Sequence, residues 1–178
     1  MRRPLTAFAV AICMLAGTAG SQPARSEFAG WREIAWPYPR DGWPAGRAFR
    51  CAIETCGGEV EVYVRPKLGF CNCDTGVSDD EEVDRVADLD LISERFVALE
   101  AGHAIRIAGM PGRSRSYELQ MADGSRHGAI GIAVSHRCDV LVAVAQGSGV
   151  APDVQRAALE FLGTSEMTRW MTAAMGGG

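Results

Sequence analysis

Cysteine is the residue of this sequence whose spacing most clearly suggests chemistry. Four cysteines fall within residues 51–73, namely Cys51, Cys56, Cys71 and Cys73. Between them, residues 59–65 alternate polar or aromatic side chains with valine, and this period of two predicts a half-buried strand. We therefore expect the thiols at the two ends of one strand, where they either form disulfides or bind a metal ion together.

The metal alternative follows from the pattern Cys-x4-Cys-x14-Cys-x-Cys. Four thiolates could hold zinc, and a Cys-x-Cys pair suits copper(I). The spacing is irregular, however, and neither half is a Cys-x2-Cys pair. We expect disulfides that involve Cys51, Cys56, Cys71 and Cys73, with the pairing open, and no cofactor. Zinc or copper bound by the same four residues is the alternative.

A thiol-dependent hydrolase is the enzymatic alternative. Cys138 follows His136 by two residues, and alternate residues of a strand point to the same side. Such an enzyme needs a thiolate beside an imidazole. No family signature surrounds Cys138, and the sequence contains no Gly-x-Ser-x-Gly, His-Glu-x-x-His or phosphate-binding glycine loop. We therefore expect no catalytic site and treat the Cys138/His136 pair as a polar turn between two strands, with Cys138 either bridged to the cysteines of residues 51–73 or buried.

The first residues have the layout of a secretory signal peptide. Arg2 and Arg3 precede an apolar run over residues 5–16, and small residues follow at 17–20. The run is shorter than the ~20 residues that span a bilayer, and a charged start, a short apolar core and a small-residue end are typical of export signals. We expect residues 1–24 to be the signal peptide and the mature protein to be periplasmic or secreted.

Export bears directly on the cysteines. Removal of the signal peptide takes away Cys13 and leaves five cysteines, the four of residues 51–73 and Cys138. In an oxidising compartment disulfides are the usual state of such residues. Because five is an odd number, at least one cysteine is unpaired or bonded to another chain.

The net charge of the mature chain argues against some classes of binding partner. Without Arg2 and Arg3 it has 16 basic and 22 acidic residues and a net charge of −6. This balance argues against nucleic acid and anionic lipid. No further apolar run is long enough to form a transmembrane segment. The expected partner is a protein or small ligand whose identity the sequence does not give.

The mature chain has the length and pattern of one domain. Residues 25–44 are a Pro/Trp-rich N-terminal segment whose tryptophans are expected to cover an edge of the core, and residues 45–175 are expected to fold together. Helices are predicted over 79–88, 152–162 and 166–175, and strands over 47–51, 59–65, 104–108, 116–121, 129–134 and 140–145. Hairpin strands with segregated helices indicate an α+β domain, a mainly antiparallel sheet with two or three helices packed on it and disulfides that stabilise it.

Local signals place some boundaries of these elements. Ser78 and Glu81 fit a capping box at the start of the first helix. Pro66 is expected to end its strand or to place it on an edge. Residues 110–113, Met-Pro-Gly-Arg, are predicted to form a turn. The unbroken apolar run over 140–145 is the best candidate for a central strand.

The order of these motifs resembles the Mog1/PsbP-like α/β sandwich family. The resemblance rests on Trp-Pro-Tyr-Pro-Arg-Asp-Gly-Trp at 36–43, the helix in mid-chain, Ile-Ala-Gly-Met-Pro-Gly-Arg-Ser-Arg-Ser-Tyr at 107–117, the strand pair within 129–145 and a closing helix. It implies a sandwich of sheet and helices that serves accessory and binding proteins more than enzymes. The cysteine cluster is not part of the family pattern, and no functional residue is carried over. Together these observations predict an exported accessory or binding module rather than an enzyme.

Overall fold

The computed structural model describes residues 30–39, 41–70, 72–149 and 151–176. The expected signal peptide, the first residues of the Pro/Trp-rich segment and Cys71 lie outside the described residues. Within the described ranges, no helix is long and apolar enough to cross a membrane.

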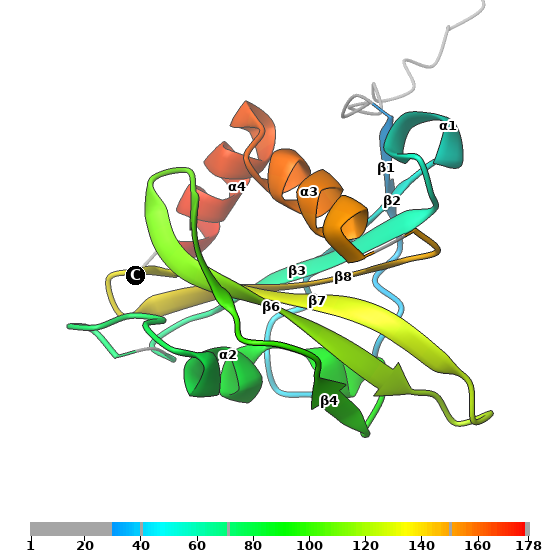
Figure 1. Ribbon diagram of the computed structural model, residues 1–178. Helices are drawn as coiled ribbons and strands as arrows, with labels where there is room; N and C mark the ends of the chain where they lie inside the picture. Colours follow the sequence, from blue (N-terminus) through cyan, green and yellow to red (C-terminus); the bar gives the residue numbers. More distant parts are fainter. Residues whose placement is uncertain (1–29, 40, 71, 150, 177–178) are drawn as a thin grey trace, which may run out of the picture.

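One antiparallel sheet organises the fold (Figure 1). Its strands lie in the order β1-β2-β3-β8-β7-β6-β4, and β5 pairs with the first part of β6. The bounds are β1 Trp31–Ile34, β2 Arg47–Cys51, β3 Val60–Lys67, β4 Phe96–Ala98, β5 His103–Ile107, β6 Met110–Gln120, β7 Arg126–His136 and β8 Asp139–Gly147.

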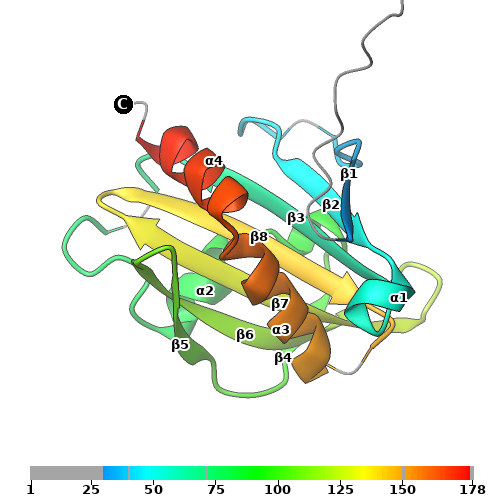
Figure 2. The same ribbon diagram turned by 90° about the horizontal axis from the view of Figure 1, so that it is seen from above.

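Helices cover both faces of this sheet. α3 (Ala151–Leu162) and α4 (Ser165–Met175) lie across one face, and α2 (Asp80–Val86) with the short 3-10 helix Leu89–Leu91 lies on the other (Figures 1 and 2). Another helix, α1 (Ile53–Cys56), forms a single turn between β2 and β3. This arrangement confirms the predicted α+β class.

Two apolar cores follow from the alternation of side chains along the strands. The valines at 60, 62 and 64 of β3 point toward α3 and α4, as their spacing predicts, and pack with Phe161 and Met171. The opposite face of β6, β7 and β8 packs against Val83 and Val86 of α2. β8 lies between β3 and β7 and is buried on both faces, which confirms the central strand predicted from the apolar run.

Two local predictions differ from the structure, and a third agrees in one of its two alternatives. Asp79, not Ser78, caps α2, and its side chain accepts a hydrogen bond from the Glu82 amide. Pro66 does not end β3, which continues to Lys67. β2 pairs only as far as Val64, so Pro66 has a neighbouring strand on the β8 side alone, in agreement with the edge alternative, and its missing N–H interrupts no ladder bond to β2.

The second difference is at residues 110–113, which belong to β6 and do not form a turn. The chain reverses just before them, where Ala108 and Gly109 take φ values of 53° and 81°. Gly112 pairs with both β5 and β7, and a Cβ at this position would collide with the Ala133 carbonyl of β7, which explains why the strand has glycine there.

Candidate functional site

Two disulfide bonds join four of the candidate cysteines. Cys51, at the end of β2, is bonded to Cys56 of α1, with the Cα atoms 6.1 Å apart. Cys73 is bonded to Cys138, which lies 65 residues further along the chain, with the Cα atoms 4.1 Å apart. The sequence pointed to four cysteines of one cluster with open pairing. The structure pairs two of them with each other and one with the distant Cys138.

The Cys51–Cys56 bond lies against the main core. Cys51 is fully buried among the residues that pack on α3 and α4, and Cys56 packs against them from α1. The short helix ends at Gly57, which takes a left-handed φ of 72° and donates its N–H to the Ile53 carbonyl. Glycine suits this position because a side chain disfavours that φ value. The bond therefore fixes the connection between β2 and β3.

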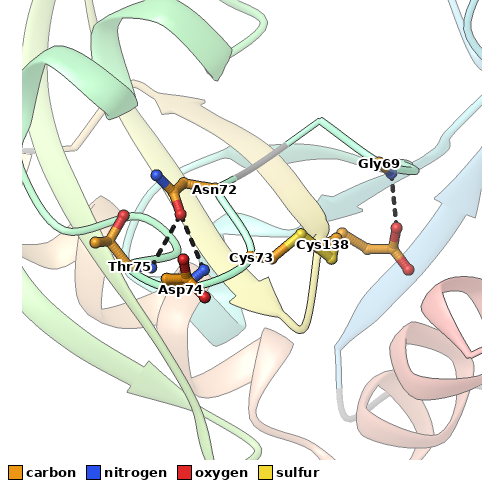
Figure 3. The surroundings of a disulfide bond; sticks show 7 residues. Gly69, Asn72, Cys73, Asp74, Thr75 and Cys138 are labelled. Atoms are coloured by element: carbon orange, nitrogen blue, oxygen red, sulfur yellow. Dashed lines mark hydrogen bonds between the residues drawn. A yellow bond between two sulfur atoms is a disulfide. The ribbon is translucent and has the colours of Figure 1, made fainter.

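The Cys73–Cys138 bond lies at the surface, where it joins the loop after β3 to the β7–β8 turn (Figure 3). The Asn72 side chain accepts hydrogen bonds from the Asp74 amide at 2.9 Å and the Thr75 amide at 3.3 Å, which fixes the turn that carries Cys73. The Gly69 amide donates to Asp139 Oδ1 at 2.7 Å beside the bridge.

The Cys138/His136 pair does not share one strand face. His136 is the last residue of β7, and Cys138 lies in the turn before β8, where Arg137 takes a φ of 57°. In the disulfide-bonded state Cys138 has no thiol to deprotonate, so the hydrolase alternative would require the reduced protein. Within the described ranges, no three His, Cys, Asp or Glu side chains lie close enough to hold a metal ion.

A buried cluster of charges, which the sequence did not single out, lies on the α2 face of β3. Arg65 donates to both carboxylate oxygens of Asp88, at 2.5 and 2.8 Å, and Lys67 lies 2.7 Å from the same carboxylate. The side chains are 3%, 8% and 7% exposed for Arg65, Lys67 and Asp88. Burial alone would lower the pKa of Arg65, but the hydrogen bonds to Asp88 and Asp41 outweigh it and raise the pKa. With Asp41, the second acidic partner of Arg65, two basic side chains face two carboxylates in this cluster.

This cluster anchors the Pro/Trp-rich segment. Asp41 accepts hydrogen bonds from both terminal nitrogens of Arg65, at 2.8 and 2.6 Å. The Trp36 ring lies 5.8 Å from the Arg65 guanidinium, and the Trp43 ring lies 5.8 Å from the Lys67 ammonium. The sequence predicts that the tryptophans cover an edge of the core. In the structure, the rings of two of them lie over the two buried cations of the cluster.

Asp41 is expected to make the stability of the protein depend on pH. The hydrogen bonds from Arg65 lower its pKa from 3.8 to about 2. Because the pKa of Asp41 is lower in the folded than in the unfolded protein, its charged carboxylate stabilises the fold fully at pH values above 3.8. This contribution to the free energy of unfolding is lost as the pH falls toward about 2. We expect Asp41→Asn to be less stable than the wild type near neutral pH and the gap to close over that interval. Urea unfolding at a series of pH values measures it, and a gap that stays constant would contradict the assignment.

Two acidic residues of α2 pair with arginines of β6. Asp80 lies 2.6 Å from Arg113, and Asp84 lies 2.7 Å from Arg115 and 2.6 Å from the Tyr117 hydroxyl. Burial and this bond to Asp84 raise the pKa of Tyr117. These ion pairs attach α2 to the sheet.

A second polar cluster lies on the same face of the sheet, nearer to α1. Glu61 accepts hydrogen bonds from Arg50, from Gln146 and from the Tyr63 hydroxyl. Burial would raise the pKa of Glu61, but these donors outweigh it and lower the pKa. The carboxylate is therefore charged and already engaged by the protein itself, which indicates a structural role.

A cavity opens between α1, β1 and the α3–α4 corner. Its volume is about 510 Å³. Trp31 and Phe161, whose rings stack at 4.4 Å, form an apolar floor with Ala157. Polar and charged groups ring the opening: Thr55, Arg156, Glu160, Thr164, Ser165 and Glu166. Cys56 of the buried disulfide forms part of the wall. Sequence reasoning missed this site because its residues come from distant parts of the chain.

Comparison with known proteins shows a similarity of fold only. No protein-family model and no curated protein matches the sequence. The solution structure of cyanobacterial PsbP (CyanoP) from Synechocystis sp. PCC 6803 matches with 14% identity and a TM-score of 0.42, over 74% of this chain and 77% of that chain. The crystal structure of PA94, a protein of unknown function from Pseudomonas aeruginosa, matches with 14% identity and a TM-score of 0.39, over 80% and 86%. These matches agree only weakly with the predicted PsbP-like resemblance, and neither a fold family nor a residue role is taken from either structure.

Proposed function

We propose that this chain is an exported, disulfide-stabilised binding module whose ligand occupies the cavity between α1, α3 and α4. The observation that supports the proposal is the composition of that cavity, an aromatic floor beneath a polar rim. Ligand sites are typically concave and mostly apolar, with a few polar groups that fix orientation. The ligand that fits is a small molecule with a flat apolar body and a polar edge.

The disulfide wall supports this proposal. Cys56 lines the cavity and is bonded to Cys51, which the core holds fully buried. The bond keeps α1 at a fixed position relative to β2, so one wall of the cavity is set before a ligand arrives. A site that is already in its binding conformation loses less entropy on binding.

Filling the cavity is expected to weaken ligand binding. Ala157 lies on the floor, so the larger side chain of Ala157→Leu occupies the space that a ligand needs. Ala173→Leu, at an exposed position of α4, is the matched control. A library of aromatic fragments is screened by saturation-transfer NMR against the mature protein. We expect fragments that bind the wild type and the control to lose about tenfold or more in affinity for Ala157→Leu.

Two outcomes of this screen would contradict the proposal. One is that no fragment binds the wild type. The other is that binding is the same in all three proteins, which would place the fragments elsewhere. Circular dichroism and thermal unfolding of Ala157→Leu separate a filled cavity from a misfolded chain.

Export and the absence of a metal are parts of the same proposal. The signal-like N-terminus and the two disulfides support them, because disulfides persist in oxidising compartments. The protein recovered from the periplasm or medium is expected to begin after one of residues 19–24 and to retain both bridges by mass spectrometry. Retention of the full-length chain in the cytoplasm would contradict export. One equivalent of zinc or copper after dialysis would favour the thiolate metal site instead.

A further inference from the structure

The four bonded cysteines differ in how far solvent reaches them. Cys51 is fully buried, and Cys56 and Cys138 are half-buried, whereas Cys73 is exposed. Thiol–disulfide exchange begins when a thiolate reaches one of the two sulfurs, so access decides which bond is attacked and at which end. Among the bonded cysteines, Cys73 offers that access most openly.

We propose that the Cys73–Cys138 bridge is a site of thiol–disulfide exchange that an external dithiol opens at Cys73, whereas the Cys51–Cys56 bond stays closed in the folded protein. The ligand class is a thiol, in the simplest case the dithiol of a second protein. The inference is independent of the cavity, which lies against the other bridge.

The proposed chemistry is a two-electron exchange. A thiolate of the external dithiol attacks Cys73 Sγ, the Cys73–Cys138 bond breaks, and Cys138 leaves as a thiolate that takes a proton from water. The mixed disulfide on Cys73 is then attacked by the second thiolate of the reagent, which releases Cys73 as a thiolate that is protonated in turn. Two electrons pass from the dithiol to the bridge, and the reagent becomes a disulfide.

Other bonds near the bridge keep the loop in place when it opens. The Gly69 amide remains hydrogen-bonded to Asp139 Oδ1, and the Val77 amide lies 3.4 Å from Ser135 Oγ on β7. The Asn72 turn does not depend on the sulfur–sulfur bond (Figure 3). The two thiols therefore stay close to each other after reduction, which favours re-formation of the bridge when the disulfide form of the reagent takes the two electrons back by the reverse exchange. Access sets the rate of opening, while these contacts make it reversible.

A glutathione experiment tests the assignment. Mature protein carrying Cys71→Ser, which removes the odd thiol, is incubated natively with reduced glutathione at about pH 8, where thiolate is available. Samples are quenched with acid, alkylated and mapped by mass spectrometry. The first glutathione adduct is expected on Cys73, and Cys73–Cys138 is expected to open about tenfold or more faster than Cys51–Cys56. The two rates should converge in concentrated guanidinium chloride, which exposes all four sulfurs.

A pair of matched variants tests the role of the loop. Asn72→Ala removes the hydrogen bonds that fix the turn at Cys73 and is expected to speed the opening of that bridge alone. Asp123→Ala removes an equivalent side-chain hydrogen bond, from the Ser125 amide in the β6–β7 loop, and should leave the opening rates of both bridges unchanged. The proposal is overturned if the first adduct forms on Cys56 or Cys51, if the native rates are equal, or if Cys73–Cys138 opens only in guanidinium chloride.

Discussion

Replacement of Asp88 by alanine is expected to lower the free energy of unfolding by about 3–5 kcal/mol. The Asp88 carboxylate is the anion that faces both Arg65 and Lys67, and all three side chains are buried. Without it, two cations lie in the interior with Asp41 as the remaining acidic partner of Arg65. An uncompensated buried charge costs far more than the ion pair contributes, which is why the expected loss is large. Urea denaturation of the wild type and the variant measures it.

Two controls locate the origin of that loss. Glu118→Ala removes the half-buried member of a surface pair with the exposed Arg126, so its expected cost is below about 1 kcal/mol. Asp88→Asn keeps the shape of the side chain and removes its charge, and we expect it to lose most of the stability that alanine loses. If Asp88→Asn were as stable as the wild type, side-chain packing rather than charge would explain the site.

Removal of the Cys73–Cys138 bond is expected to cost more stability than removal of Cys51–Cys56. In the chain-entropy model a bond that closes a longer loop restricts the unfolded chain more. The sequence separations are 65 and 5 residues, which correspond to about 4 and about 2 kcal/mol. The variants are Cys73→Ala/Cys138→Ala and Cys51→Val/Cys56→Ala, both in a Cys71→Ser background. Valine at 51 keeps the core filled.

The comparison is made by urea denaturation of the oxidised proteins at one pH. The parent Cys71→Ser protein is the reference, so the thiol of Cys71 does not contribute to the differences in unfolding free energy. Equal losses, or a larger loss for the Cys51/Cys56 pair, would show that native contacts rather than loop length determine the contribution of each bridge.

The local sequence pattern predicted much of the sheet. The alternation over 59–65 gave β3 and the inward direction of its valines, because a strand with one buried face must alternate. The apolar run over 140–145 gave the central β8, because a strand buried on both faces needs no polar side. The end of α3 and the start of α4 follow from Gly163 and the cap Thr164.

Features set by contacts between distant segments could not be predicted in the same way. Nothing near Cys73 indicates that its partner is Cys138, since the pairing depends on where the β7–β8 turn lies in the folded sheet. The cluster of Arg65, Asp88 and Asp41 likewise joins three separate segments. In the sequence, the cluster is indicated only by two basic residues at alternate positions of β3 and by an Asp-Gly turn between prolines. Each of these patterns is also common on solvent-exposed surfaces, so neither predicts a buried cluster.

The two bridges divide the polypeptide into covalent rings that do not overlap. Residues 51–56 form a small ring and residues 73–138 a large one, which contains α2 and the strands β4 to β7. A protease that cuts the backbone once inside the large ring leaves a nicked molecule in one piece, since the sulfur bond still joins the fragments. A cut between 56 and 73, or beyond 138, separates two polypeptides. A single cut in an exposed turn of the large ring therefore does not release a fragment for as long as Cys73 and Cys138 stay oxidised.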